Sequence, residues 1–272
     1  MKGGAYYNMA LDEAIAVARS RGIVPNTLRF FRWVPSAVSI GYFQSMNEEV
    51  DVEACRRLGI DYVRRRTGGG AVYHDRDGEL TYSIAVDEDD PLVSKDFQKT
   101  YETLCSGIVH GLRILGIPAE FKPINDIVVG EKKISGNAAT RALKVVHQHG
   151  TILRKVNPKL MFTVLKVPNE KIRDKMVKSV EERVTSVEWF LKREVGFQEL
   201  KEALKRGFEE AFKIELVPGE VTGFEEELAE KLRVKNTPQL GGTSGDSQRD
   251  LLKPVQFKLP QPVWNNLQKV FA

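Results

Sequence analysis

The chain of 272 residues is 42% hydrophobic and 29% charged, a composition that suits one large domain or two unequal ones. Its 41 Lys and Arg residues exceed its 37 Asp and Glu residues by only four, which does not argue for nucleic-acid binding but fits recognition of an anionic nucleotide or an acidic protein. Two cysteines, no Cys/His cluster with metal-ligand spacing and no signal peptide or membrane-spanning run predict a soluble cytoplasmic protein without disulfides or structural zinc.

The first 115 residues predict short strands between amphipathic helices. Apolar residues at a spacing of three to four indicate the helices, and Asp51 and Gly59 have the residue types of helix caps. Aromatic and β-branched runs indicate the strands. The predicted elements are helices over 8–21, 51–59 and 97–115, and strands over 27–33, over 37–42 and within 62–86.

The rest of the chain predicts strands first and helices afterwards. Strands with two hairpin turns occupy 127–153, and helices are predicted over 158–165, 170–178, 197–212 and 224–232. This order is typical of an α+β domain with a mixed or antiparallel sheet flanked by helices. A stretch rich in Gly, Pro, Ser, Thr and Asn follows at 236–250, so we predict a domain over 1–235 and a polar linker with a tail of unknown role over 236–272.

The glycine-rich segment RRRTGGGAVYHD, residues 64–75, is the first candidate binding site. Three consecutive glycines permit positive φ and close approach of a ligand to the backbone, whose N–H groups can hold phosphate oxygens. The arginines add fixed positive charge. No P-loop pattern occurs in the chain. The alternative is a tight hairpin with a charged flank.

The second candidate is NDIVVGEKKISGNA, residues 125–138. Strand alternation predicts that Lys133 and Ser135 share one face of a sheet while Ile134 points the other way. A lysine on an inner face requires an anion, and an acyl-adenylate would provide one. Asp126 has the chemistry of a Mg²⁺ ligand. The alternative is that Lys132 and Lys133 form a solvated hairpin.

The third candidate is HQHG, residues 147–150, in which two histidines lie on one face of a strand. A metal pair is conceivable, but no third ligand is evident in the sequence. Hydrogen-bonded structural histidines are the favoured interpretation.

Together these motifs resemble the lipoate-protein ligase A family, within the biotin/lipoate protein ligase superfamily. NMALDEA near the start and SVEERVTSVEWF near residue 180 are similar to further landmarks of that family, and the resemblance covers about residues 5 to 235 in order. It implies the catalytic domain of that superfamily. The chain resembles the archaeal-type large subunit that lacks the C-terminal accessory domain, and such members often need a small accessory subunit for adenylation.

The resemblance implies an ATP-dependent reaction in two steps. Lipoate and ATP would form lipoyl-AMP, and a carrier lysine would then attack the mixed anhydride. Lys133 would be the catalytic residue, and Asp126 would support Mg²⁺. The implied partners are lipoyl domains of 2-oxoacid dehydrogenases and the H-protein of glycine cleavage. The remaining residues implied to bind ATP, the adenylate or lipoate are Arg65, Gly70, Ala71, Val72, Tyr73, His74, Asn125, Asp126, Ser135, Gly136, Ala138 and His149.

Two other functions stay open at this point. One is a lipoyl-AMP-binding transferase subunit that does not adenylate by itself. The other is an ATP-independent octanoyltransferase of the same fold, whose relatives use a cysteine nucleophile, in some cases just before the Lys-x-Ser-Gly strand. No cysteine occurs there in this chain, Cys105 fits a buried helix, and Cys55 beside Arg56 and Arg57 could have a lowered pKa.

Overall fold

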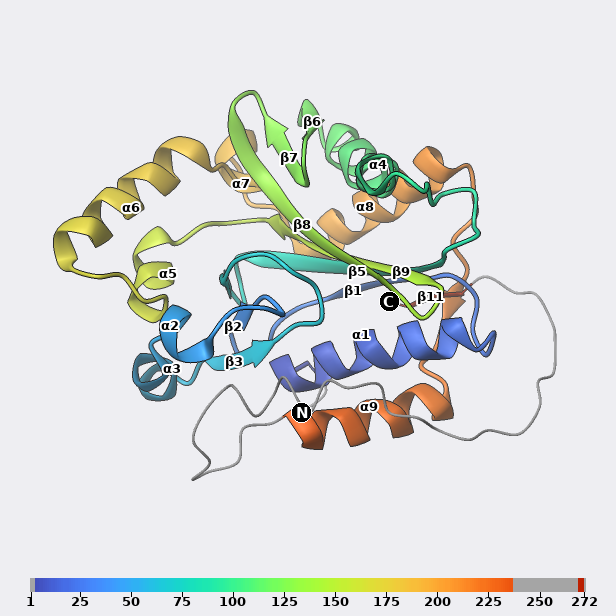
Figure 1. Ribbon diagram of the computed structural model, residues 1–272. Coiled ribbons are helices and arrows are strands. Elements are labelled where there is room, and N and C mark those ends of the chain that lie inside the picture. The colour runs from blue at the N-terminus through green and yellow to red at the C-terminus, as the bar shows by residue number, and fades with distance from the viewer. Residues whose placement is uncertain (1–2, 237–268, 272) are drawn as a thin grey trace.

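The computed structural model describes residues 3–236 and 269–271, and its central element is an eight-stranded sheet (Figure 1). The strand order is β10-β11-β1-β5-β9-β8-β7-β6. β11 is parallel to both of its neighbours and the other pairs are antiparallel, so the sheet is mixed as predicted. The strands are β1 (Thr27–Phe31), β5 (Glu79–Asp87), β6 (Ala119–Lys122), β7 (Asp126–Val129), β8 (Lys132–Ala142), β9 (Val145–Leu153), β10 (Pro218–Gly219) and β11 (Lys269–Phe271).

A second, three-stranded sheet carries part of the glycine-rich segment. Its central strand β2 (Ala37–Ile40) pairs parallel with β3 (Asp61–Arg64) and antiparallel with β4 (Val72–His74). Helices α2 (Met46–Glu49), α3 (Val52–Leu58) and α5 (Pro158–Val164) contribute side chains to its apolar cluster. The predicted caps of α3 are confirmed, because the Asp51 side chain accepts from Ala54 N and Gly59 is left-handed with φ 63°.

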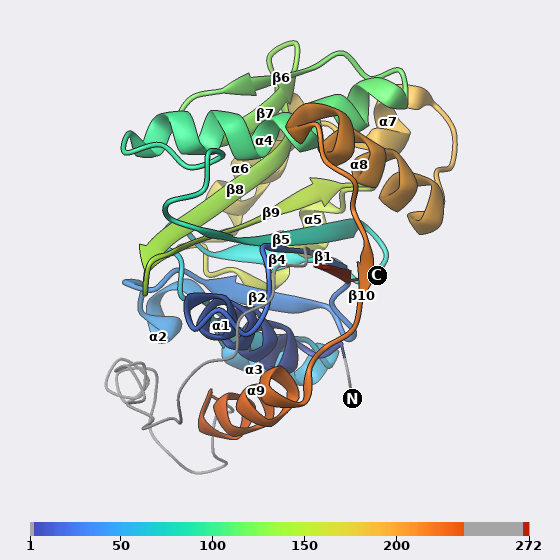
Figure 2. The same ribbon diagram turned by 90° about the vertical axis from the view of Figure 1, so that its right-hand side faces the viewer.

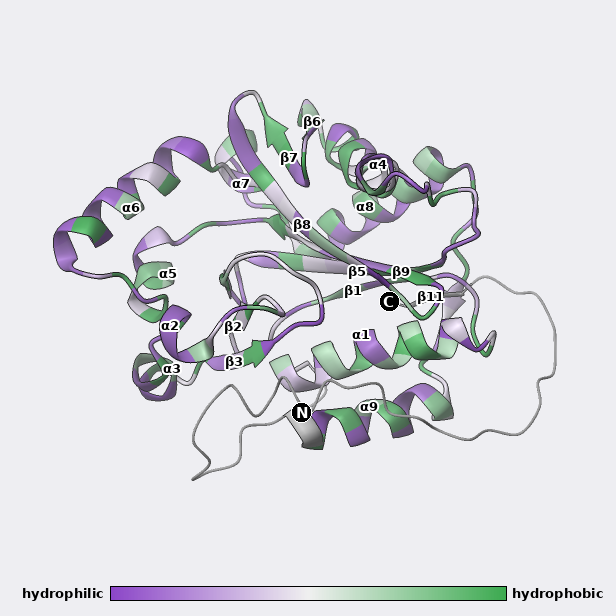
Figure 3. Cartoon of the chain, viewed as in Figure 1, coloured by the Kyte–Doolittle hydropathy of each residue, from purple (hydrophilic) through white to green (hydrophobic). Residues whose placement is uncertain are grey.

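Two helix pairs cover opposite faces of the large sheet (Figures 1 and 2). On one face, α1 (Ala5–Ser20) packs on α9 (Gly223–Asn236), and their apolar residues meet Ala85 and Val145 of the sheet. On the other face, α4 (Phe97–Ile114) packs on α8 (Phe197–Phe212). Hydrophobic and hydrophilic residues alternate along these helices (Figure 3), as burial of a single helix face requires.

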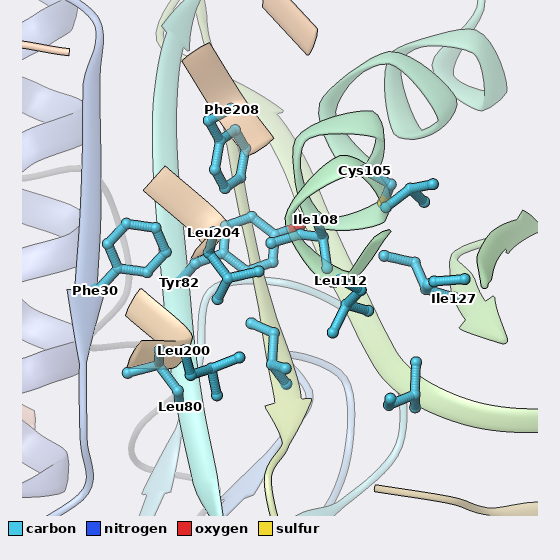
Figure 4. Close-up of a cluster of buried hydrophobic side chains, with 14 of the residues drawn as sticks. Phe30, Leu80, Tyr82, Cys105, Ile108, Leu112, Ile127, Leu200, Leu204 and Phe208 are labelled. Atoms are coloured by element: carbon cyan, nitrogen blue, oxygen red, sulfur yellow. The ribbon is translucent and has the colours of Figure 1, made fainter. Parts of the chain in front are cut away.

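The α4–α8 pair forms the main core with the sheet and leaves no space for side chains where the two backbones cross. A Cβ on Gly207 would lie 2.1 Å from Gly111 N and 2.4 Å from Gly107 O. Figure 4 shows Phe208 and Tyr82 in this core, together with Cys105 of α4. The close approach fixes both helices on the sheet.

Helix α6 (Glu170–Arg183) contrasts with the core helices, because none of its residues is buried. It extends beyond the predicted end at 178 and is followed by the short helix α7 (Val187–Leu191). The helices of the described residues include none that is long and apolar enough to cross a membrane.

The sequence missed five short elements, namely α2, α7, β6, β10 and β11. Asn236, placed in the predicted linker, is instead the last residue of α9. The rest of the linker at 236–250 and most of the tail lie outside the described residues, whereas 269–271 add β11 to the large sheet. The predicted domain boundary at 235 stays a prediction.

Candidate active site

A cavity of about 430 Å³ lies between the small sheet and the β5–β9–β8 part of the large sheet, and α5 and α6 close one side of it. Arg65, His74 and Lys133 contribute polar groups. The apolar part of the wall comes from Leu153, Val156, Met161, Val180 and Val184. A cavity of this size and mixed character suits a small amphiphilic ligand.

The Arg65 guanidinium determines the shape of the glycine loop between β3 and β4. Its Nη2 donates to the carbonyl oxygens of Gly68 and Gly70, each at 2.8 Å, and its Nε donates to Thr67 Oγ1 at 3.1 Å. Burial lowers the pKa of Arg65 to about 10, so the side chain is still charged at neutral pH. The Nε and Nη2 donors of the guanidinium are therefore engaged by the loop itself.

The glycine loop also rests directly on the end of β2. A Cβ on Gly41 would lie 2.0 Å from Gly69 O, whereas one on Gly70 would meet nothing within 4 Å. Gly69 itself has φ +98°, which a side chain rarely adopts. The hairpin alternative is wrong, because β3 and β4 do not pair with each other but lie on either side of β2. Residues 69–71 of the loop that connects them line the cavity.

Lys133 on β8 lines the cavity and pairs with Asp126 on β7, with 2.7 Å between Nζ and Oδ1. The Asp126 carboxylate thus supplies the compensating anion that the sequence required. The prediction that Ser135 shares a face with Lys133 is wrong. The register shifts between Ile127 and Val128, so Ser135 is fully buried outside the cavity wall.

The chain before β7 is held to β8 by two asparagines. Asn137 Nδ2 donates to Asn125 O at 2.8 Å, and Asn125 Nδ2 donates to Asn137 O. Tyr82 OH donates to Asn137 Oδ1 at 2.7 Å. Gly150 is required opposite, because a Cβ there would lie 2.0 Å from Asn137 Oδ1. Asn125 is therefore fixed at the cavity edge.

His74 is buried at the cavity wall between Ser39 and Glu79. Its Nε2 lies 2.8 Å from Ser39 Oγ, and its Nδ1 lies 2.8 Å from Glu79 Oε1. The Trp33 indole stacks on the imidazole with 4.0 Å between ring centroids. Trp33 Nε1 and Thr81 Oγ1 also donate to Glu79 Oε1, at 3.1 and 2.6 Å. The His74 ring is thus fixed on both edges and on one face.

His147 and His149 are buried, and each is hydrogen-bonded to a hydroxyl group, as the sequence favoured. His149 Nε2 lies 2.8 Å from Thr67 Oγ1, and His147 Nε2 lies 3.0 Å from Ser83 Oγ. Burial lowers the pKa of His147 to about 4, against the opposing effect of Asp12. The sequence did not reveal Asp12, whose carboxylate comes within reach of both rings.

This Asp12–His147–His149 group is the one His/carboxylate cluster of metal-binding size in the described part of the chain. Asp12 already has a cation beside it, since Arg29 Nη2 lies 2.5 Å from its Oδ1. Although burial alone would raise the pKa of Asp12, Arg29 and the hydrogen bond with His149 lower it well below the usual range. The donor chemistry is that of a charge-compensated buried network and not that of a cation site.

Magnesium at Asp126 is a poor match for the same reason. Its carboxylate is paired with the Lys133 ammonium, which occupies the oxygen that a cation would need, and it belongs to no group of three or more metal-ligating side chains among the described residues. Mg²⁺ usually takes one or two carboxylates together with phosphate oxygens.

Neither cysteine of the chain lies on the cavity wall. Cys105 belongs to the α4–α8 core (Figure 4), and Cys55 belongs to the apolar cluster of the small sheet. Burial raises the pKa of each thiol to about 12. The expectation that Arg56 and Arg57 could lower the pKa of Cys55 is wrong, because burial and the charge of Asp51 have the larger effect.

The structure brings most of the sequence-predicted site together. Asp126 and Ser135 do not line the cavity, although Asp126 contacts Lys133. Sequence reasoning missed Trp33, Ser39, Glu79 and Thr81, which support His74. The predicted residues on the cavity wall are Arg65, Gly70, Ala71, Val72, Tyr73, His74, Asn125, Lys133, Gly136, Ala138 and His149.

Known proteins with similar sequences belong to one family. The family model of the lipoyl protein ligase A/B catalytic domain matches residues 4–209. The octanoyltransferase LipM of Kyrpidia tusciae is 41% identical over 256 residues, which cover 86% of this chain and 93% of the relative. The octanoyltransferase LipM of Geobacillus kaustophilus is 36% identical, and the match covers 83% of this chain and 89% of the relative.

Solved structures agree on the fold. A bipartite lipoate protein ligase of Thermoplasma acidophilum, described with its E2 lipoyl domain, is similar with a TM-score of 0.78 and 39% identity, covering 86% of this chain and 89% of that chain. A lipoate-protein ligase A bound with ATP has a TM-score of 0.73 and 36% identity, covering 86% of this chain and 91% of that chain.

These findings correct the function expected from the sequence. An ATP-dependent lipoate ligase that forms lipoyl-AMP is contradicted by the curated relatives, which are octanoyltransferases. The alternative of an octanoyltransferase agrees better with them. Because the family model matches residues 4–209 and the Kyrpidia relative matches most of the chain, the protein belongs to the lipoyl protein ligase A/B catalytic domain family.

Proposed function

We propose that the protein transfers an octanoyl-class acyl group from a thioester donor to a specific lysine of a lipoyl carrier domain. The donor class follows from the octanoyltransferases among its relatives. The acceptor class is supported by the similar archaeal ligase, which is described with an E2 lipoyl domain. The H-protein of glycine cleavage is a second acceptor in this proposal, whereas the accessory subunit expected for adenylation has no role in a transfer that needs no ATP.

The cavity is the observation that supports this function. Its α5–α6 side provides Met161, Val180 and Val184 for an acyl chain. Burying about seven carbons of an octanoyl chain at roughly 0.8 kcal/mol each would contribute about 6 kcal/mol. The charged group of Lys133 lines the same cavity and can interact with the reacting carbonyl.

Lys133 has the position of an electrostatic catalyst. Its amine pairs with Asp126, and its side chain is 41% exposed, so it is available to a carbonyl oxygen that becomes negative during attack. A thioester is already activated and needs no phosphate chemistry. This agrees with the engagement of the Arg65 guanidinium by Gly68 and Gly70.

The chemistry must proceed without a thiol of this chain. Both cysteines are buried outside the cavity wall. We therefore expect a protein with Cys55→Ala and Cys105→Ala together to retain octanoyl transfer, apart from the loss of stability that core truncation causes.

The decisive experiment mixes the purified chain with the octanoyl thioester of an acyl carrier protein and an apo lipoyl domain. Intact mass of the lipoyl domain reports the reaction, and a domain with its acceptor lysine replaced by arginine is the control. We expect one octanoyl group per domain without ATP. Modification only from lipoate with ATP, or only from synthetic lipoyl-AMP, would contradict the proposal.

A further inference from the structure

Ser39, His74 and Glu79 form a hydrogen-bonded chain on the wall of the cavity. Ser39 Oγ lies 2.8 Å from His74 Nε2, and His74 Nδ1 lies 2.8 Å from Glu79 Oε1. All three residues are buried, and all three line the cavity. A hydroxyl, an imidazole and a carboxylate in this sequence of contacts are the parts of an activated serine nucleophile.

The partners of Glu79 determine the direction of each hydrogen bond in this chain. Glu79 Oε1 accepts from Trp33 Nε1 and Thr81 Oγ1 and therefore acts as an acceptor toward His74 as well. The proton of a neutral imidazole is then on Nδ1, and Nε2 is the acceptor. Ser39 Oγ–H consequently donates to His74 Nε2, which is the tautomer that removes a proton from serine.

A positive charge lies next to the same oxygen. Arg65 Nη1 is 3.1 Å from Ser39 Oγ and 3.2 Å from Ser39 O. Because this guanidinium is buried and rigidly held by the glycine loop, its charge is little screened by water. It stabilises negative charge that develops on Oγ.

The geometry points to Ser39 as a nucleophile that receives the acyl group from the thioester before the carrier lysine does, an inference that rests on the proposed acyl transfer. Ser39 Oγ attacks the thioester carbon while His74 Nε2 takes the hydroxyl proton. The C–S bond breaks, and the leaving thiolate takes that proton. The carrier amine then attacks the Ser39 ester, His74 accepts the amine proton, and that proton returns to Ser39 Oγ as the C–O bond breaks.

Two other hydroxyl–imidazole pairs in the chain provide a comparison. Thr67 lies 2.8 Å from His149 Nε2 and Ser83 lies 3.0 Å from His147 Nε2, yet neither hydroxyl residue lines the cavity. Ser39 differs from them because it borders the cavity. Ser83→Ala is therefore a matched control, since it removes the same buried hydroxyl from an imidazole away from the site.

The experiment traps the acyl-enzyme. The full chain is mixed with an octanoyl thioester, quenched in acid within seconds and examined by intact mass and peptide mapping, and a parallel sample is treated with an octyl fluorophosphonate. We expect one octanoyl group and one phosphonyl group, both on Ser39. Ser39→Ala should lose both adducts and reduce transfer by roughly 10³-fold or more, whereas Ser83→Ala should keep both.

Ser39→Cys provides a second test that does not depend on folding of the alanine variant. Thermal unfolding of all variants is measured in parallel. The new thiol should form a thioester adduct that neutral hydroxylamine removes. Absence of both adducts in the wild type, or full transfer by a folded Ser39→Ala, would overturn the inference. Labelling of Ser39 without transfer to the lipoyl domain would instead overturn the proposed function and leave the nucleophile in place.

Discussion

Gly41→Ala should disorganise the active site through the glycine loop. The new Cβ would lie 2.0 Å from Gly69 O and 3.2 Å from Gly68 C, and both are backbone atoms that no rotamer change can move. The loop must retreat by about 1 Å to reach even the 3.0 Å that real Cβ atoms keep. That retreat pulls Gly68 O and Gly70 O away from the Arg65 guanidinium, which now binds each at 2.8 Å.

Overpacking of this kind costs about 1–3 kcal/mol of unfolding free energy. In a domain of this size that lowers Tm by roughly 2–12 °C. A displacement of 1 Å at a catalytic site can reduce the rate by about 10²-fold. Differential scanning calorimetry and the octanoyl-transfer assay measure the two effects.

Gly70→Ala is the matched control for stability, because its Cβ meets nothing within 4 Å. Its Tm should equal that of the wild type. A Gly41→Ala protein with wild-type Tm and wild-type transfer rate would refute the reasoning that the loop rests on β2.

Three further predictions concern catalysis, pH and packing. Lys133→Ala should reduce octanoyl transfer by about 10²–10³-fold, as removal of one preorganised donor does. Lys132→Ala, which changes the exposed neighbour, is the control. Equal transfer rates for the two variants would exclude the electrostatic role of Lys133. His147 takes up a proton near pH 6.5 in the unfolded chain but only near pH 4 in the folded chain. The unfolding free energy should therefore fall as the pH falls from 6.5 to 4, by at most about 3 kcal/mol from this residue. In urea titrations at a series of pH values, His147→Gln should make the unfolding free energy depend less on pH in this range. Gly207→Ala should lower the unfolding free energy despite the about 1 kcal/mol that alanine gains in a helix, because its Cβ meets backbone. The control is Gly223→Ala in α9, whose Cβ meets nothing within 4 Å and which should be neutral or slightly stabilising in the same urea titration.

The elements that sequence predicted well are those specified by local chemistry. Helix α4 follows its apolar spacing to within one residue, and α3 has the predicted Asp51 and Gly59 caps. Strands such as β10 and β11, of two and three residues, exist only through pairing with distant parts of the chain. No local pattern predicts such pairing.

The prediction that Lys133 and Ser135 share one face of β8 failed for a related reason. A shift of register between Ile127 and Val128 places Lys133 and Gly136 together at the cavity and leaves Ser135 buried elsewhere. Such a bulge depends on both strands, so reading one strand cannot locate it.

The residues that support the site were missed because their partners are far away in sequence. Ser39 and His74 are 35 residues apart, and Asp12 and His149 are 137 apart. One signal was available for Asp12. Asn8 and Asp12 are four residues apart within an otherwise apolar helix face, and polar residues at such positions imply buried partners, here Arg29.

The cavity wall formed by helix α6 should separate from the rest of the protein more easily than the walls formed by strands. None of its residues is buried, yet Val180 lies on the cavity wall, whereas the opposite walls are strands of the two sheets. The free energy of local opening scales with the apolar contacts that must be broken, so α6 can separate from the cavity while the core stays folded. In the proposed transfer reaction, this wall would therefore adjust to acyl chains of different length, whereas the strands of the two sheets would keep their geometry.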